Sequence, residues 1–402
     1  MRKRIALLGL LLLVGDASAQ RVTWLGEISA YPSKLYDISP DGQWVVGVEF
    51  ANPPVPIAAQ YPFTSIIRLN IPQMTLGFAN AVHADSRGVV VVGEYQITRD
   101  HISHSEAFWW RPDEHTLGLL GTGCLCEGVH GQSAAAYAVR GLPGDEDFQV
   151  LGTASHNFGS EVRSSAVRFP CTPLFCGGDP RQKSVFAVSH YGPVVIAGGT
   201  PLAAGYEVPY GFVFHETLGL VDTGTPMRGV AADGSMVVGG GVLWTPEDGF
   251  ISFLPGPWND VATASTGCPE PFRVVGGSEF EDVSYAVLGR YTDGAETFDL
   301  RYPDLIADGS SFSVATGISA DGRYVVGWGW NGTRMRMEGF ILDLCRKQYG
   351  DANCDLNIDD ADLLQVLFRF GEVCAGDCPE DFNEDGTIDD ADLLIALFNF
   401  GS

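Results

Sequence analysis

Seven copies of one short phrase, spread over residues 36–327, constrain the fold of this chain more than any other feature. Each copy ends in an apolar run closed by glycine, as in ISPDGQWVVG (38–47), AADGSMVVG (231–239) and ISADGRYVVG (318–327). The closing glycines are Gly47, Gly93, Gly152, Gly198, Gly239, Gly276 and Gly327. The six steps between the first and the last average about 47 residues, a period typical of repeat architectures built from one supersecondary unit per repeat.

Strand-like segments follow these glycines in a constant order. An apolar or aromatic run comes first, then a polar turn and a second run, as in AFWW (107–110) with TLGLL (116–120) and GFVF (211–214) with TLGLV (217–221). Short β-rich runs separated by turn residues indicate antiparallel hairpins.

The two ends of the repeat region complement each other. RVTWLGEIS (21–29) is similar to the last strand of a repeat, and the seventh repeat stops at GFILDL (339–344) without such a strand. If the N-terminal strand completes the last repeat, the ring closes and no sheet edge is left exposed. The sequence therefore predicts an all-β fold, a seven-bladed β-propeller over residues 21–344, followed by a small α-helical module.

The Asp-Gly pairs within the repeats have two interpretations, a ligand site or a hairpin corner. Copies three, four and six lack the pair but keep the strand after it. Glycine tolerates the positive φ of a tight turn. We therefore predict that Asp321-Gly322 and its equivalents form hairpin corners.

The first nineteen residues have the pattern of a secretory signal peptide. Three basic residues precede the apolar run 5–14, and Ala17-Ser18-Ala19 fits a small-residue cleavage site. We expect cleavage after Ala19, a secreted or cell-surface protein, and no transmembrane span, because no segment is long and apolar enough to cross a bilayer. The expected organisation is a signal peptide (1–19), a propeller domain (20–345), a linker (346–350) and a calcium-binding domain (351–402).

Charge and cysteine content narrow the class of protein further. The formal net charge of −26 excludes nucleic-acid partners, which require basic surfaces. Nine cysteines in an exported chain favour disulfides, with at least one left unpaired. Cys124 and Cys126, with Cys171 and Cys176, leave a zinc site open as the alternative.

The acidic C-terminal segment contains two related loops, thirty residues apart. GDANCDLNIDDADLLQVLFRFG (350–371) aligns with EDFNEDGTIDDADLLIALFNFG (380–401). A twelve-residue calcium loop supplies oxygen ligands from positions 1, 3, 5, 7, 9 and 12, with glycine at position 6. The sequence thus predicts two Ca²⁺ sites, formed by Asp351, Asn353, Asp355, Asn357, Asp359 and Asp362, and by Asp381, Asn383, Asp385, Thr387, Asp389 and Asp392.

The two loops differ at position 6, which is Leu356 in the first loop and Gly386 in the second. A non-glycine residue in a left-handed conformation costs roughly 1–2 kcal/mol. We therefore predict that the second site binds calcium more tightly. One short helix is expected after each loop, with Asp359 and Asp389 as N-caps.

Two resemblances follow from these motifs. ISADGRYVVGWGW with EGFILDL resembles the bacterial extracellular HAF-type repeats, which imply export and repetition. Two loops that are each followed by a single helix resemble type I dockerin modules, which implies calcium binding and docking to a partner. The partners implied are a cohesin-like or other cell-surface protein, or a polysaccharide. Loop positions 10–11 are Asp-Ala in both copies, and the helix middles carry Leu-Phe.

Motifs of catalysis are absent from the sequence: there is no nucleophile elbow, no His-Glu-x-x-His and no phosphate loop. His101 and His104 fall in a segment expected to be a polar loop, and His115 and His215 in repeat turns. We favour a non-catalytic binding or surface protein. The alternatives are a polysaccharide-active enzyme, a glycoside hydrolase or lyase on a propeller, and a structural coat component. Acidic or histidine side chains converging at the mouth of the central tunnel would favour the enzyme.

Overall fold

The computed structural model describes residues 21–401 except for a series of segments within this range. The gaps are 100–101, 123–131, 143–147, 159–160, 170–171, 175–183, 200–210, 240–241, 253–260, 266–271, 281–282, 292–295, 300–308, 345–349, 354–357, 375–377 and 384. The proposed signal peptide lies outside the described residues. Two compact units are present, one of Val22–Leu344 and one that contains Cys345–Ser402.

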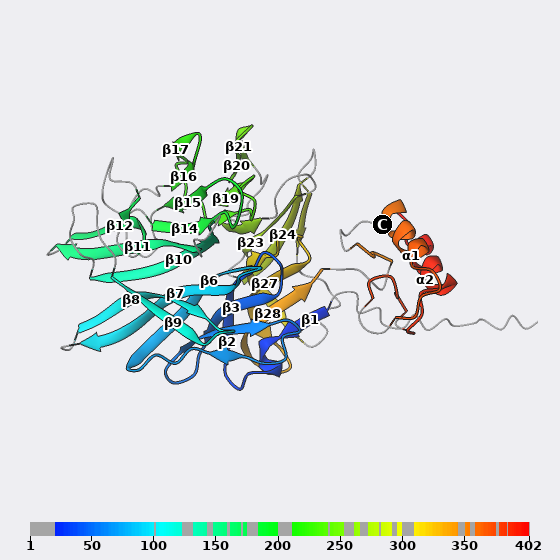
Figure 1. The fold of residues 1–402 in the computed structure, drawn as a ribbon, viewed down its shortest axis with the longest axis horizontal. Coiled ribbons are helices and arrows are strands. Elements are labelled where there is room, and N and C mark those ends of the chain that lie inside the picture. The colour runs from blue at the N-terminus through cyan, green and yellow to red at the C-terminus, as the bar shows by residue number, and fades with distance from the viewer. Residues whose placement is uncertain are drawn as a thin grey trace, which may run out of the picture. The chain divides into compact units, whose positions relative to one another are not determined.

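The first unit is built of four-stranded antiparallel sheets, here numbered 1 to 7 in chain order (Figure 1). Sheet 1 consists of β2 (Ser33–Ile38), β3 (Trp44–Glu49), β4 (Val55–Gln60) and β5 (Ile67–Arg68). Sheet 2 consists of β6 (Met74–Asp85), β7 (Gly88–Arg99), β8 (Ile102–Arg111) and β9 (Thr116–Gly121). Sheet 3 consists of β10 (Ser133–Gly141), β11 (Phe148–Phe158), β12 (Glu161–Arg168) and β13 (Thr172–Pro173).

Sheets 4 to 6 have the same strand order. Sheet 4 consists of β14 (Ser184–Val188), β15 (Val195–Gly199), β16 (Gly211–His215) and β17 (Gly219–Asp222). Sheet 5 consists of β18 (Gly229–Val230), β19 (Val237–Gly239), β20 (Val242–Thr245) and β21 (Gly249–Ser252). Sheet 6 consists of β22 (Val261–Ser265), β23 (Phe272–Phe280), β24 (Val283–Tyr291) and β25 (Glu296–Asp299).

Sheet 7 joins the two ends of the unit. It consists of β26 (Ser311–Ile318), β27 (Tyr324–Asn331), β28 (Arg336–Asp343) and, beside β28, the N-terminal strand β1 (Arg21–Trp24). The prediction that the N-terminal strand completes the last repeat is therefore confirmed. A short 3₁₀ helix, η1 (Leu25–Glu27), follows β1, and the buried carboxylate of Glu338 accepts a 3.1 Å hydrogen bond from the Gly26 N–H.

The first strands of the sheets form a closed cycle of contacts. β2 contacts β6, and the series continues through β10, β14, β18, β22 and β26 back to β2. Apolar clusters fill the spaces between neighbouring sheets, for example Val92 of sheet 2 with Ala136 of sheet 3. This packing explains the nearly continuous apolar composition of the second strands, which are buried on both faces.

The closing glycines of the repeats are required by close approach of backbone. β2 carries a bulge between Leu35 and Asp37, and Gly47 lies opposite it. A Cβ on Gly47 would overlap the carbonyl oxygen of Lys34. Gly93, Gly152, Gly198, Gly239 and Gly327 face a backbone carbonyl in the same way. In six of the seven sheets the closing glycine therefore meets the same steric requirement, and the spacing of these glycines follows the spacing of the sheets.

The Asp-Gly pairs form hairpin corners, as predicted. Gly322 has φ +75°, and its N–H donates to the Ser319 carbonyl at 2.9 Å. Asp321 accepts hydrogen bonds from Ser319 Oγ at 2.5 Å and from the Arg323 N–H at 3.0 Å. Ser39, Asp41 and Gly42 repeat this geometry in sheet 1.

The second unit has two helices, α1 (Asp360–Phe368) and α2 (Asp390–Phe398), each following one acidic loop. Asp359 and Asp389 are the N-caps, as predicted, each in a capping box with the aspartate three residues later. Val366, Ile388 and Ala396 contribute to its small core. In the described part of the chain, no helix is long and apolar enough to cross a membrane.

One disulfide, Cys374–Cys378, is present in the second unit. The other seven cysteines lie outside the described residues, so the proposed zinc alternative at Cys124, Cys126, Cys171 and Cys176 is not tested.

Candidate functional site

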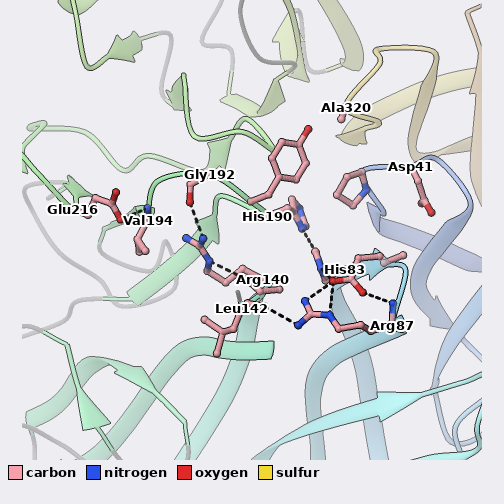
Figure 2. A pocket seen from close by; sticks show the side chains of 15 residues that line it. Asp41, His83, Arg87, Arg140, Leu142, His190, Gly192, Val194, Glu216 and Ala320 are labelled. Carbon is pink, nitrogen blue, oxygen red and sulfur yellow. Dashed lines mark hydrogen bonds and ion pairs between the residues drawn. The ribbon is translucent and has the colours of Figure 1, made fainter. Parts of the chain in front are cut away.

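Hairpin corners from five sheets of the first unit line one pocket of about 810 Å³ (Figure 2). Apart from Glu216, which lies in the turn between β16 and β17, the lining residues belong to corners that connect the first two strands of a sheet. The cyclic contact of the first strands brings these corners together. The lining residues are Pro40 and Asp41 of sheet 1; His83, Ala84, Asp85 and Arg87 of sheet 2; Arg140, Gly141 and Leu142 of sheet 3; His190, Tyr191, Gly192, Val194 and Glu216 of sheet 4; and Ala320 of sheet 7.

Two histidines from different sheets meet in this pocket. His83 Nδ1 lies 3.1 Å from His190 Nδ1, and the rings are nearly coplanar, with an interplanar angle of 12°. The ring centroids are 5.4 Å apart, which exceeds the nitrogen separation by about two ring radii. The imidazoles therefore meet edge to edge through one N–H···N hydrogen bond and do not stack.

The protons on this pair follow from the adjacent carboxylate. Asp85 Oδ2 lies 3.3 Å from His83 Nε2 and can only accept, so neutral His83 carries its proton on Nε2. His83 Nδ1 is then an acceptor, and His190 must donate from its own Nδ1. His190 Nε2 is left unprotonated, and among the described residues it has no hydrogen-bond partner.

Both histidines are neutral at physiological pH. Burial lowers the pKa of His83, against the opposing effect of Asp85. Burial, with His83 and Arg140 nearby, lowers the pKa of His190 to about 3. Asp85 remains ionised, because hydrogen bonds from Arg87, the nearest at 2.5 Å, lower its pKa to about 2.

Arg140 is a buried cation in the pocket wall, with 3% of its surface exposed. Its guanidinium donates to Ser189 Oγ at 3.1 Å and to the Gly192 carbonyl at 3.0 Å. Among the described residues no carboxylate forms an ion pair with it. Burial lowers the pKa of Arg140, and the charge of Glu216 opposes this effect.

A second, smaller cavity of about 250 Å³ in the first unit contains Glu94 and Tyr137. Burial raises the pKa of Glu94 to about 7. Burial and the Glu94 charge also raise the pKa of Tyr137. The cavity therefore holds a carboxyl group that is only partly ionised at neutral pH.

The second calcium loop is described at all six predicted positions. Asp381 is 4% exposed, and its Oδ2 accepts from the Gly386 N–H at 3.0 Å. Its Oδ1 is buried and has no hydrogen-bond partner among the residues that the structure describes. Burying a carboxylate oxygen without a hydrogen bond costs free energy, and coordination of a hard cation would offset that cost. Gly386 has φ +89°, the left-handed conformation expected at position 6.

The remaining predicted ligands are engaged with backbone. Asp392 is fully buried and accepts from the N–H groups of Phe382, Asn383 and Asp389. Asp385 accepts from the Thr387 N–H, and Asp389 from the Ala391 N–H.

The first loop shows the same arrangement where it is described. Asp362 is fully buried and accepts from the N–H groups of Ala352 and Asn353. Asp351 is also fully buried. Asp355 and Asn357 lie outside the described residues, and among those described no three acidic, histidine or cysteine side chains are gathered closely enough to hold a metal ion. The donor types fit calcium, and the described parts of the two loops do not present a formed shell of ligands.

The helices after the loops expose apolar side chains. Phe368 is 82% exposed and Phe398, thirty residues later, is 84% exposed. The other exposed apolar residues of this segment are Leu364, Leu367, Phe370, Val373, Leu394, Leu397 and Phe400. The opposite side of each helix packs in the unit's core, through Val366 in α1 and Ala396 in α2.

Three of the histidines considered from the sequence are described, and none of these three lines the large pocket. His104 lies on β8 with Nδ1 3.2 Å from the Gln132 carbonyl; its assignment to a polar loop was wrong, because β7 and β8 pair as far as Arg99 and Ile102. His115 occupies the turn before β9, and His215 ends β16. His101 lies outside the described residues. His83 and His190 were not identified from the sequence.

One sequence signal could have revealed the pocket. The corners of sheets 1 and 7 begin with Ser39 and Ser319, which cap the turn. His83 and Arg140 occupy the equivalent positions in sheets 2 and 3, according to the strand register. Departures from the repeat, rather than its common residues, mark the site.

Comparisons with known proteins assign no family to this chain. No family model and no curated protein matches the chain. The structure of U3-55K shares 12% identity with it, covering 82% of this chain and 100% of its own, with a TM-score of 0.47. The β-propeller domain of the Trilobed protease from Pyrococcus furiosus shares 11% identity over 78% of this chain and 94% of its own, with a TM-score of 0.43. The mostly β character of the chain follows from its own sheets.

Proposed function

We propose that this chain is a secreted, non-catalytic binding protein, made of a seven-bladed β-propeller of HAF-like repeats and a calcium-binding, dockerin-like docking module. The seven sheets and the cyclic contacts of their first strands support the blade count. The signal-peptide pattern of residues 1–19 supports export.

The observation that carries the docking role is the duplicated exposed apolar surface of α1 and α2. Monomeric proteins rarely expose contiguous apolar patches of this kind outside interaction sites. Phe368 and Phe398 are each more than four-fifths exposed, although each lies in a helix whose other side is packed. The segment 351–402 holds 14 Asp or Glu residues and one Arg, giving a charge of −13. A partner protein with an apolar groove bordered by basic residues would complement this surface.

Calcium has a specific role in this proposal. The donor set of Asp381, Asn383, Asp385, Thr387, Asp389 and Asp392, and its counterpart in the first loop, would hold one ion each, with the second site the tighter. Neutralising the carboxylates would fix the loop that begins each helix and so the relative position of the two apolar surfaces.

Binding of the mature protein to an array of purified cohesin domains and cell-wall polysaccharides tests the proposal. We expect capture that is lost on adding EGTA and in a Phe368→Ser/Phe398→Ser variant. Leu119→Ser, which changes a 57% exposed apolar residue of the first unit, is the matched control and should bind normally. Binding that survives both EGTA and the double substitution would contradict a calcium-dependent docking module.

A polysaccharide-active enzyme is the second candidate. The convergence of Asp85, His83 and His190 in one pocket favours it, because carboxylate–imidazole pairs serve general acid–base chemistry. Incubation of the mature protein with the same polysaccharides, followed by assay of reducing ends and of unsaturated sugar products, tests this role. Bond cleavage that is abolished in His190→Asn would replace the binding proposal with the enzymatic one.

A further inference from the structure

The large pocket of the first unit combines several hydrogen-bond acceptors with one cation, Arg140, that forms no ion pair within the described part of the chain. We propose that it binds an acidic sugar, a ring that carries both a carboxylate and hydroxyl groups. This site is separate from the docking surface and does not depend on the function proposed for α1 and α2.

Arg140 supplies the carboxylate position. Its guanidinium has five N–H donors, and the described structure uses them only on neutral acceptors, Ser189 Oγ and two backbone carbonyls. A buried cation without a counter-ion is unfavourable. A planar ligand carboxylate matches the guanidinium fork and would supply the missing charge.

His190 supplies an acceptor for a hydroxyl group. The hydrogen-bond chain from Asp85 through His83 leaves His190 Nε2 with a lone pair and no partner among the described residues. A group that stays neutral can accept from a ligand O–H without competing for the ligand's charge.

Two exposed carboxylates at the pocket add acceptors of the same kind. Asp41 uses one oxygen to close its own corner, and Glu216 accepts from the Val194 N–H at 3.0 Å through Oε2 only. Ionised carboxylates are acceptors only and therefore select hydroxyl or N–H donors. Tyr191, 48% exposed, adds an aromatic surface suited to the C–H face of a sugar ring.

Other ligand classes satisfy only part of this set. A small inorganic or carboxylate anion would pair with Arg140 but leave the acceptors of the pocket unused. A neutral sugar would satisfy the acceptors and leave Arg140 without a counter-ion. An acidic sugar satisfies both.

Arg140 also has a structural contact, which the experiment must separate from binding. It connects sheet 3 to the corner of sheet 4 through the Gly192 carbonyl. Arg273 makes the same kind of contact between sheets 6 and 7, donating to the Gly322 carbonyl at 2.7 Å, and it does not line the pocket. Arg273→Met is therefore a matched control for Arg140→Met.

Calorimetric titration of the mature protein with D-galacturonate and D-glucuronate tests the proposal, with D-galactose, D-glucose and acetate as comparison ligands. We expect at least one uronate to bind at least tenfold more tightly than its neutral counterpart and than acetate. Arg140→Met should weaken uronate binding at least tenfold, His190→Phe several-fold, and Arg273→Met not at all. Binding should persist in EGTA, which distinguishes it from calcium-dependent docking.

Three results would overturn the proposal: no uronate binding at millimolar concentration, equal binding of the neutral sugar or of acetate, or unchanged binding in a folded Arg140→Met variant. If Arg140→Met does not fold, two results decide the question: the preference of the wild-type protein for uronate over the neutral sugar and acetate, and several-fold weaker uronate binding in His190→Phe.

Discussion

His83 Nδ1 and His190 Nδ1 lie 3.1 Å apart although the residues are 107 positions apart in the chain and belong to sheets 2 and 4. Sheet 3 separates these sheets in the cycle of contacts, so the two side chains meet where the corners of the first strands converge. Because Asp85 fixes the proton on His83, the contact also fixes the tautomer of His190. This one hydrogen bond therefore determines which chemical group the pocket presents.

The neutral histidine pair predicts acid sensitivity of the first unit. The pKa of His190 is about 3 in the folded protein, against 6.5 as its ordinary value, so the unfolded chain binds the proton more readily. The stability from neutral His190 is complete above pH 6.5 and is lost as the pH falls toward 3. Between pH 7 and pH 4.5, we expect the free energy of unfolding to fall by about 2 kcal/mol more in the wild-type protein than in His190→Asn.

Urea unfolding followed by tryptophan fluorescence measures this effect, because all eight tryptophans precede residue 345. His115→Asn, a substitution at an exposed turn, is the control and should unfold with the wild-type pH dependence. An identical loss of stability between pH 7 and pH 4.5 in wild type and His190→Asn would show that the pair does not titrate as argued.

Glu94 predicts a pH dependence of opposite sign. Burial raises its pKa from 4.5 to about 7, so the folded state holds the proton and the stability it contributes is lost as the pH rises from about 4.5 through 7. Glu94→Gln should be more stable than wild type at pH 8 by about 2 kcal/mol and should show no such gain at pH 4. Tryptophan-monitored urea midpoints at both pH values check this, with exposed Glu247→Gln as the control. Equal midpoints of Glu94→Gln and wild type at pH 8 would contradict it.

The repeat glycines predict a steric cost that is specific to their position. A methyl group on Gly47 would overlap the Lys34 carbonyl oxygen, so Gly47→Ala should lower the free energy of unfolding by about 3 kcal/mol. Gly121 has φ +72° and nothing within 4 Å of an added Cβ, so Gly121→Ala should cost only about 1 kcal/mol, from backbone conformation. Urea midpoints of the two variants measure the difference, and similar values would show that close approach is not what the repeat requires.

The fold was predictable from the repeat because the backbone of each sheet requires particular residues at positions close together in the chain. The bulge in β2 requires a glycine at position 47, and the corner requires a residue with positive φ at Gly42. Both requirements place glycines at regular positions in the repeat. The N-caps Asp359 and Asp389 were predictable for the same reason, since a cap and its helix are adjacent in the chain.

The pocket was not predictable because its members share no local pattern. His83 and His190 meet only through closure of the cycle of sheets, and sequence distance carries no trace of that contact. Arg140 occupies a position where other repeats place a serine that caps the corner. A repeat-by-repeat comparison of those corner positions is the route by which such a site could be found.

The difference at loop position 6 predicts unequal calcium affinities. Gly386 adopts φ +89° in the second loop, and a leucine at the equivalent position 356 would have to adopt a conformation that costs roughly 1–2 kcal/mol. Leu356→Gly should therefore tighten the weaker of two calcium-binding steps about tenfold and leave the tighter step unchanged. Calorimetric titration of the mature protein measures both steps, and no change in either would contradict the assignment.

Removal of calcium is expected to unfold the second unit alone. Its two loops carry many carboxylates beside a core as small as Val366, Ile388 and Ala396, and the repulsion among these charges is unopposed without a cation. Calcium at ~100 times its dissociation constant would add about 2.7 kcal/mol per site to the free energy of unfolding.

On adding EGTA, the helical circular dichroism of α1 and α2 should be lost. Tryptophan fluorescence, which arises only before residue 345, should stay native. Asp392→Ala should reproduce the loss in the presence of calcium, because Asp392 is both a predicted ligand and the acceptor of three backbone N–H groups, whereas its neighbour Asp390→Ala should not. Simultaneous loss of both signals on chelation would show that calcium stabilises the whole chain and not the second unit.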